Sequence, residues 1–200
     1  MTSDLNIILP EILLSLFAML ALLGAVYTGK DKLAGTLVWA TAGLLIALAI
    51  WIATSASGTQ TAFNGMYLAD AFAHFSKLVI LISAAVVLVM GQGYMAARGL
   101  LKFEYPILIS FATLGMMMMI SANDLIALYI GLELQSLSLY VLAAMQRDSL
   151  RSTEAGLKYF VLGAVSSGML LYGCSMIYGF TGTTNYGDLA NYLTGETPAS

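Results

Sequence analysis

Six long apolar runs are the feature of this sequence that most restricts its fold. They cover residues 7–27, 33–54, 72–96, 106–121, 125–145 and 156–179. An α-helix needs about 20 apolar residues to cross a bilayer, and each run is of this order. The runs lack the alternation of apolar and polar residues, over segments of about ten residues, that a transmembrane β-barrel requires. The sequence therefore predicts an all-α, polytopic transmembrane protein with six helices.

The composition excludes several classes of soluble protein. Hydrophobic residues make up 60% of the chain and charged residues 10%, whereas soluble domains carry about 25% charged residues. The net charge of −3 and the lack of a basic tract argue against nucleic-acid binding. With one histidine and one cysteine, Cys174, the sequence lacks the ligands for a haem pair, an iron–sulfur cluster or a typical zinc site. We therefore expect no cofactor, no metal and no redox chemistry on this chain.

The basic residues predict the orientation in the membrane. Six of the eight lie in the first, third and fifth connectors between the apolar runs: Lys30, Lys32, Arg98, Lys102, Arg147 and Arg151. The N-terminal tail, the second and fourth connectors and the tail after residue 180 contain no Lys or Arg. By the positive-inside rule, we expect the N-terminus outside and the odd-numbered connectors on the cytoplasmic side.

The connectors also carry local signals for helix ends. Pro106 suits the first turn of the fourth helix, where its missing N–H costs no hydrogen bond. Asn123 and Asp124 form a tight turn before the fifth helix and can cap it. Residues 181–200 are expected to form an outer loop, with one short surface helix at Asp188–Leu193.

Glu133 lies near the middle of the fifth apolar run. An ionisable side chain at that depth costs at least ~2.5–3.5 kcal/mol to insert. At about 100° per residue it falls in a narrow stripe of one helix face, made up of Tyr129, Glu133, Ser136 and Tyr140. We expect this stripe to face protein or internal water, where the carboxyl can take up and release a proton. The alternative is a static hydrogen bond between helices.

Lys158 is a second ionisable residue inside a predicted span. Glu154 precedes it by four residues, which is the favourable order for an ion pair, and lies in the first turn of the helix. The opposite face carries Gly156, Gly163 and Ser167, which are small enough to let another helix approach closely. Lys158 either presents its ammonium group within the membrane or extends it to the cytoplasmic interface.

Asp70, His74 and Lys77 are spaced to share one face at the outer end of the third predicted helix. Histidine titrates near neutral pH, so one interpretation is a proton exit or an ion gate. The favoured interpretation is a polar cluster at the membrane interface whose members satisfy one another.

Residues 121–184 resemble a known family. Four motifs carry the resemblance: NDLIALYIGLELQSLSLY (123–140), RDSLRSTEAGLKYF (147–160), LGAVSSGMLLYG (162–173) and IYGFTGTT (177–184). They closely resemble the chain N family of proton-pumping NADH–quinone oxidoreductase, respiratory complex I. The motifs are specific and span about 60 residues. The first three helices fit the family in number and placement, and their sequence is less diagnostic.

The resemblance implies a non-redox subunit of the membrane arm, related to cation/proton antiporters. Members have about fourteen helices with two inverted repeats, each containing a broken helix. On this pattern, Glu133 corresponds to the key glutamate of the fifth helix and Lys158 to the lysine of the sixth, with Glu154 tuning that lysine as its ion-pair partner. Protons would be loaded from the cytoplasmic side, exchanged through lysine–glutamate coupling and released outside.

The resemblance also implies what lies outside this chain. NADH, FMN, iron–sulfur clusters and quinone would be bound elsewhere in the complex, and quinone reduction there would supply the energy. The expected partners are other membrane-arm subunits, both antiporter-like and small, together with membrane lipid. The expected location is the bacterial inner membrane, with several spans and a periplasmic N-terminus.

Three segments are expected within the chain. Residues 1–103 form a three-helix transmembrane segment, residues 104–180 begin the first antiporter-like repeat, and residues 181–200 lead toward a missing broken helix. The lysine partner of Glu133 and the second repeat are expected after residue 200. The chain is therefore interpreted as the N-terminal portion of a longer subunit.

Two other functions remain open on the sequence. One is a subunit of a multisubunit cation/proton antiporter, which would share the acid–lysine pair. The other is a structural membrane scaffold whose charges only fix helix packing. The motifs between residues 147 and 184 favour the respiratory subunit over the antiporter.

Overall fold

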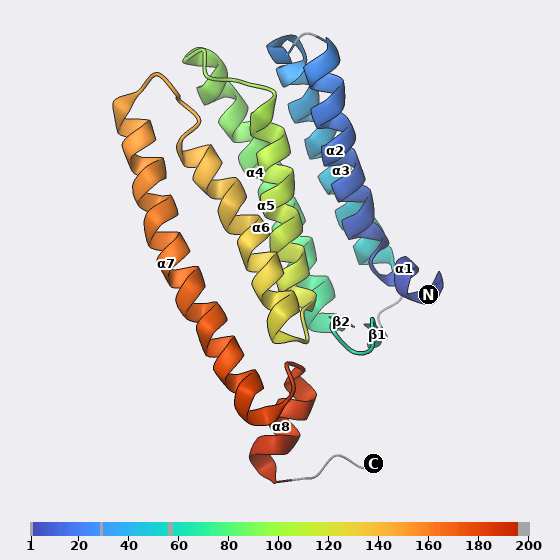
Figure 1. Cartoon of the computed structure of the whole chain (residues 1–200). Helices are drawn as coiled ribbons and strands as arrows, with labels where there is room; N and C mark the ends of the chain where they lie inside the picture. Colours follow the sequence, from blue (N-terminus) through green and yellow to red (C-terminus); the bar gives the residue numbers. More distant parts are fainter. Residues whose placement is uncertain (1, 29, 56–57, 196–200) are drawn as a thin grey trace.

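The computed structural model describes residues 2–28, 30–55 and 58–195. Within these residues, six helices are long and apolar enough to cross a membrane: α2 (Leu9–Thr28), α3 (Ala34–Thr54), α4 (Ala71–Ala97), α5 (Glu104–Ser121), α6 (Leu125–Ala143) and α7 (Leu150–Thr181). They run side by side in alternating directions (Figure 1). The predicted six-helix membrane domain is thus confirmed.

The connectors contain more structure than the sequence predicts. The short helices are α1 (Thr2–Ile7), the 3-10 helix η1 (Lys30–Leu33) and α8 (Tyr186–Thr194), which includes the predicted surface helix. The second connector forms an antiparallel hairpin of β1 (Gln60–Ala62) and β2 (Tyr67–Ala69), which was not predicted. Strands of three residues are too short to produce a recognisable alternation of polar and apolar residues.

Helix α7 begins at Leu150, six residues before the predicted start at residue 156. The prediction missed these first turns because they are polar. The side chain of Ser149 caps this end by accepting a hydrogen bond from the backbone N–H of Ser152. A search for apolar runs detects only the part of a helix that lies in lipid. The polar turns therefore place Glu154 inside the helix rather than at its start.

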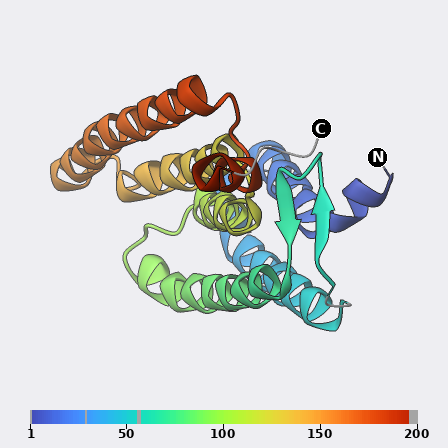
Figure 2. The same cartoon turned by 90° about the horizontal axis from the view of Figure 1, so that it is seen from below.

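Helix α5 lies at the centre of the bundle and packs against α2, α3, α4 and α6. Its span is 56% buried, whereas the span of α7 is 6% buried. The main apolar core includes Leu14, Leu45, Leu81 and Met117, from four different helices. Figure 2 shows α7 at the margin of the bundle, beside α6. The apolar core contains residues from both sides of residue 103, so the two segments pack as one unit. The predicted boundary at residue 103 concerns the repeats of the family and stays a prediction.

Glycine residues allow α5 and α6 to pack backbone against backbone. A Cβ atom added to Gly115 would lie 2.6 Å from the carbonyl oxygen of Gly131. A Cβ atom added to Gly131 would lie 2.9 Å from the backbone nitrogen of Met119. Both distances are too short for a real side chain, so this close packing fixes the position of α6 and of the acid it carries.

Three connectors meet at the end of the bundle that carries α1, the hairpin, the α5–α6 turn and α8, which we call the hairpin end (Figures 1 and 2). The backbone N–H of Asn123 donates to Met66 at 2.9 Å, and Tyr67 forms a β-bridge with Ala122. Asp124 forms a second bridge, with Asn185. These bonds join the hairpin, the α5–α6 turn and the loop before α8.

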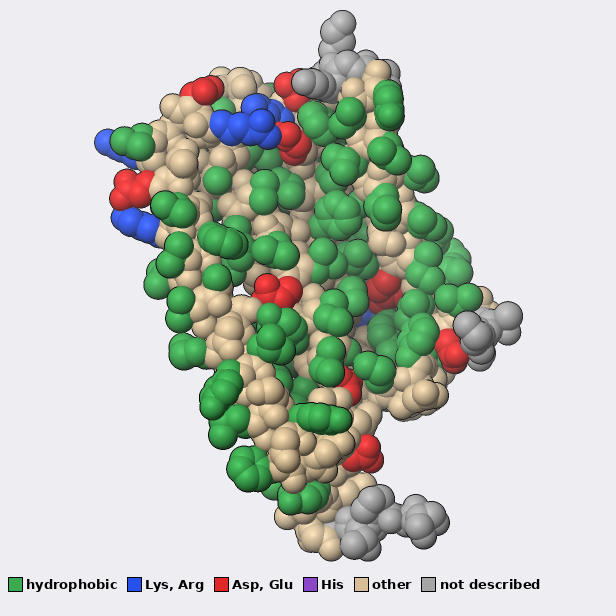
Figure 3. All heavy atoms as spheres, in the orientation of Figure 1, with side chains coloured by type: hydrophobic (Ala, Val, Ile, Leu, Met, Phe, Trp, Pro, Cys, Tyr) green, Lys and Arg blue, Asp and Glu red, His purple; other side chains and the backbone are tan. Residues whose placement is uncertain are grey.

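The opposite end carries the α2–α3, α4–α5 and α6–α7 connectors, and we call it the basic end. Figure 3 shows most of the Lys and Arg side chains of the visible face near this end. Arg147 and Glu104 form an ion pair there at 2.9 Å. The two ends of the bundle therefore differ in charge as the sequence predicts.

Candidate functional site

Glu133 lies eight residues after the start of α6, near the midpoint of the helix, and is half-buried. The hydroxyl of Ser167, on α7, donates a hydrogen bond to Oε1 of Glu133. The hydroxyl of Tyr129 lies 3.0 Å from the same serine oxygen. Because a serine hydroxyl has one hydrogen, which here goes to Glu133, Tyr129 is the donor to Ser167. The result is a chain of hydroxyls that ends on a carboxyl in the middle of a spanning helix.

The stripe predicted on α6 faces α7, as expected for a polar face inside a membrane. Tyr140 is buried, and its ring meets those of Tyr159 and Phe160 edge to face, with centroids 4.7 and 5.7 Å apart. A Cβ atom at Gly163 would clash with the hydroxyl of Tyr140. The small residue therefore makes room for the aromatic ring, and three members of the predicted stripe, Tyr129, Glu133 and Tyr140, contact α7.

Lys158 forms an ion pair with Glu154 at 2.6 Å, and their side chains are 70% and 56% exposed. Gly156 is buried, and a Cβ atom there would lie 2.5 Å from Cβ of Ala144, the C-cap residue of α6. Lys158 follows two residues later, about 200° around the helix axis from Gly156, and so lies on the opposite face of α7. Within the described residues its ion-pair partner is Glu154, and Glu133 is bonded through Ser167 instead.

The predicted cluster of Asp70, His74 and Lys77 is only partly present. Asp70 caps α4 by accepting from the backbone N–H of Ala73 at 2.7 Å, and Nδ1 of His74 lies 2.7 Å from the backbone oxygen of Asp70. Lys77 leaves this group and pairs with Glu11 of α2 at 2.7 Å. A nearby acid on another helix is a stronger partner for its ammonium group than a carboxyl already used as a helix cap.

Sequence reasoning missed the group formed by Glu11, Lys77 and Tyr67. Glu11 and Lys77 are each 6% exposed and lie 66 residues apart in the chain. The Tyr67 hydroxyl donates to Oε1 of Glu11 at 2.7 Å and accepts from Lys77 at 2.5 Å. The signal in the sequence was one acid and one base near the same end of two spans. Periodicity along a single helix cannot reveal such a pairing.

Within the described residues, no group of three or more His, Cys, Asp or Glu side chains is arranged to hold a metal ion. Cys174 is buried in α7 as a free thiol.

Comparison with known proteins agrees with the six-helix bundle. Residues 122–199 match the family described as NADH:quinone oxidoreductase/Mrp antiporter, TM. Among solved structures, a chain of respiratory complex I from Thermus thermophilus with bound aureothin superimposes with a TM-score of 0.70 and 29% identity, covering 88% of this chain and 38% of that one. A chain of the Mrp complex from Dietzia sp. DQ12-45-1b gives 0.68 and 21% identity, covering 92% and 36%, and shows the fold alone. The fold is that of the antiporter-like membrane subunits.

Curated relatives narrow this class. NADH-quinone oxidoreductase subunit N of Jannaschia sp. (strain CCS1) is 62% identical over 185 residues, and that of Rhodobacter capsulatus is 59% identical over 184. Over this length the chain is closely similar to NADH-quinone oxidoreductase subunit N. The aligned part covers 92% of this chain and 38% of either relative, so the chain spans about two fifths of their length.

Proposed function

We propose that this chain is the N-terminal portion of a non-redox membrane-arm subunit that translocates protons, driven by quinone reduction in other subunits. The observation that carries the proposal is the position of Glu133, which lies midway along a spanning helix and accepts a hydrogen bond from Ser167, itself hydrogen-bonded to Tyr129. The curated relatives are named as subunits of an NADH–quinone oxidoreductase, which supports the coupling to quinone. NADH, FMN, iron–sulfur clusters and quinone would then be bound by other subunits.

The hydroxyl chain suggests how a proton reaches Glu133. Ser167 gives its hydroxyl hydrogen to a carboxylate oxygen of Glu133 and takes the hydrogen of Tyr129 in the same movement. Tyr129 then recovers a proton from water or from a neighbouring group, and the number of protons stays balanced. Such a relay works in either direction, because each hydroxyl is both donor and acceptor.

Lys158 and Glu154 are proposed to serve the same path from the exposed face of α7. A salt bridge this exposed contributes little to stability. If another part of the protein covered this face of α7, the pair would be buried and its charges would interact more strongly. The relatives are longer than this chain, and their remaining part is a candidate to cover this face of α7. We propose that Lys158 exchanges protons there while Glu154 adjusts its charge.

The orientation is part of the proposal. The basic end would face the cytoplasm and the hairpin end the periplasm of a bacterial inner membrane, because basic connectors remain on the cytoplasmic side. Protons would then be loaded from the basic end and released toward the hairpin end. The partners would be other antiporter-like and small membrane-arm subunits, together with lipid.

The decisive test is Glu133→Gln in the full-length subunit within its assembled complex. The amide keeps the size and the hydrogen bond of the carboxyl but cannot carry a proton, so we expect proton pumping driven by NADH to fall about tenfold or more. Pumping is measured in inverted membrane vesicles with a pH-sensitive dye. Glu104→Gln is the matched control, because Glu104 pairs with Arg147 at the basic end and away from the hydroxyl chain. Wild-type pumping in an assembled Glu133→Gln complex would sink the proposal.

Purification from native membranes separates the respiratory subunit from the antiporter alternative. A subunit of the proposed complex copurifies with proteins that hold flavin and iron–sulfur clusters, which are detected by their absorption and paramagnetic spectra. Copurification with antiporter subunits alone would favour the cation/proton antiporter instead.

A further inference from the structure

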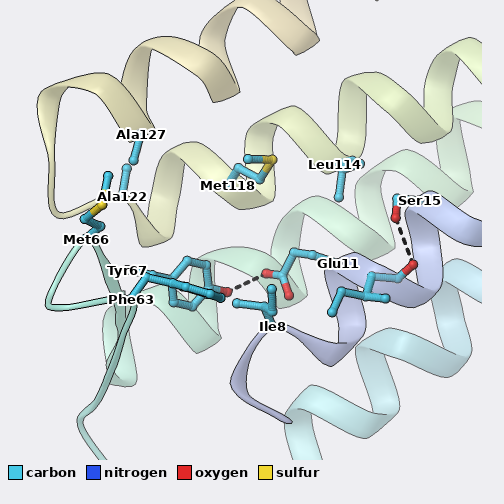
Figure 4. Close-up of a pocket in the computed structure, with 11 residues that line it drawn as sticks. Ile8, Glu11, Ser15, Phe63, Met66, Tyr67, Leu114, Met118, Ala122 and Ala127 are labelled. Atoms are coloured by element: carbon cyan, nitrogen blue, oxygen red, sulfur yellow. Dashed lines mark hydrogen bonds between the residues drawn. The ribbon is translucent and has the colours of Figure 1, made fainter. Parts of the chain in front are cut away.

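Glu11, Lys77 and Tyr67 form a buried group near the hairpin end, which we call the Glu11 site. Glu11 is the third residue of α2, Lys77 the seventh of α4, and Tyr67 the first of β2. Figure 4 shows the phenol of Tyr67 directed at the Glu11 carboxyl, beside Ile8. Three separate elements thus converge on one carboxyl oxygen, Oε1, which receives hydrogen bonds from both Lys77 and Tyr67.

The second carboxyl oxygen of Glu11 is left without a partner. Oε2 is buried and has no hydrogen-bond partner among the described residues. An unsatisfied buried oxygen is costly, and more so when it carries charge. A buried ion pair is stable only when its remaining lone pairs are also satisfied. Oε2 is therefore the oxygen of this site that is available to accept a proton.

A polar cavity gives water access to this site. The cavity measures about 230 Å³ and is lined by Glu11, Lys77 and His74, together with uncharged polar side chains: Asn6, Ser55 and Gln60. This volume is enough for several water molecules, and the lining offers them partners. On its other side Glu11 borders a cavity of about 490 Å³ whose walls are mainly apolar (Figure 4). The carboxyl thus stands at the boundary between a polar space and an apolar one.

Glu11 is the carboxyl among the residues that line the polar cavity. Burial and the nearby Glu11 charge raise the pKa of the Tyr67 phenol, so the phenol stays protonated and acts as a donor. On α4, Asp70 caps the helix and His74 is bound to its backbone oxygen at the cavity wall. The lining residues from α1, α3 and α5 are uncharged.

We propose that the Glu11 site is a second proton-exchange site, reached through the polar cavity at the hairpin end. A hydronium ion in the cavity transfers its proton to the Glu11 carboxyl, whose Oε2 has no hydrogen-bond partner among the described residues: one O–H bond breaks, one forms, and a water molecule remains. Release is the reverse step, and it restores the ion pair with Lys77. Tyr67 keeps its hydrogen bond to Oε1 in both states, and His74 lines the cavity that the protons cross.

The test is infrared difference spectroscopy of the full-length subunit in its complex, recorded between acid and alkaline pH in H2O and D2O. A proton-exchange site gives a protonated-carboxyl band that appears at low pH, shifts in D2O and is missing in Glu11→Gln. The Glu104→Gln control retains this band. Lys77→Met leaves an unpaired buried carboxylate, so the band should persist to higher pH by about one pH unit or more, a tenfold change in proton affinity.

A second measurement distinguishes exchange from a purely structural clamp. If Glu11 exchanges protons with the hairpin-end solution, Glu11→Gln alters the pH profile of proton pumping, whereas a clamp changes only the amount of assembled complex. The absence of any Glu11-dependent band overturns the inference, even if Glu133→Gln stops pumping. The presence of the band supports it even if Glu133→Gln pumps normally, because the infrared signal does not depend on the proposed function.

Discussion

At the scale of single residues, Ser167 determines what Glu133 can do. Its hydroxyl is both the donor to the carboxyl and the acceptor from Tyr129, so the chain of hydroxyls is broken if it is lost. The next residue, Ser166, also lies on α7, but its hydroxyl donates to the backbone oxygen of Leu162 at 3.0 Å and is exposed. Two adjacent serines thus have different surroundings and form a matched pair for mutagenesis.

We expect Ser167→Ala to lower NADH-driven proton pumping about threefold to tenfold, with the subunit still assembled. A threefold to tenfold loss corresponds to about 0.6–1.4 kcal/mol, which is within the range of about 0.5–1.5 kcal/mol for one hydrogen bond. Vesicle pumping assays measure the rate, and native gels measure assembly. Ser166→Ala should pump at the wild-type rate; equal rates in the two variants would contradict a relay through Ser167.

At the scale of elements, helix α7 is held by one narrow strip of small residues. Gly156 and Gly163 let it lie against the end of α6 and the Tyr140 ring, while most of its other side chains are exposed. A larger side chain in this strip separates the two helices and pulls Ser167 away from Glu133. The hydroxyl chain therefore depends on the contact between α6 and α7.

Gly163→Leu should destabilise the α6–α7 contact by about 1–3 kcal/mol, because the added side chain overlaps the Tyr140 hydroxyl. Limited proteolysis between the two helices is expected to become faster, and pumping to fall as in Ser167→Ala. Gly168→Ala is the control, since a Cβ atom there meets nothing within 4 Å. Equal proteolysis rates in the two variants would show that the strip does not hold α7.

The elements also show what a sequence can and cannot predict. The six spans follow from hydrophobicity, which is a local property, and the cap at Asp124 follows from local turn chemistry. Glu133 could be identified because charge at that depth is expensive in any fold. Its bond to Ser167, and the pair of Glu11 with Lys77, join residues 34 and 66 positions apart, and only helix packing brings them together.

At the scale of the whole molecule, the hairpin end is one connected polar network. Asp124 caps α6 by accepting from the backbone N–H groups of Ile126 and Ala127, and it also accepts from the Thr184 hydroxyl at 2.6 Å. One carboxylate therefore stabilises the start of α6 and attaches the loop before α8.

Asp124→Ala should cost about 1–2 kcal/mol, the usual effect of losing a helix cap. Amide hydrogen exchange should become faster at the start of α6 and around residues 184–186, since both depend on the same side chain. Asp188→Ala is the control, because Asp188 is exposed and accepts a hydrogen bond from the Thr183 hydroxyl, away from the α6 cap. Unchanged exchange in Asp124→Ala would show that the network does not depend on this cap.

The β-bridge between Tyr67 and Ala122 has a mechanical consequence. The backbone of Tyr67 is attached to the α5–α6 turn, while its phenol is attached to Glu11 on α2. The hairpin therefore connects the α5–α6 turn to Glu11 on α2. A rotation of α6 that displaces the α5–α6 turn would move Tyr67 and thereby change its hydrogen bond to the Glu11 carboxyl on α2.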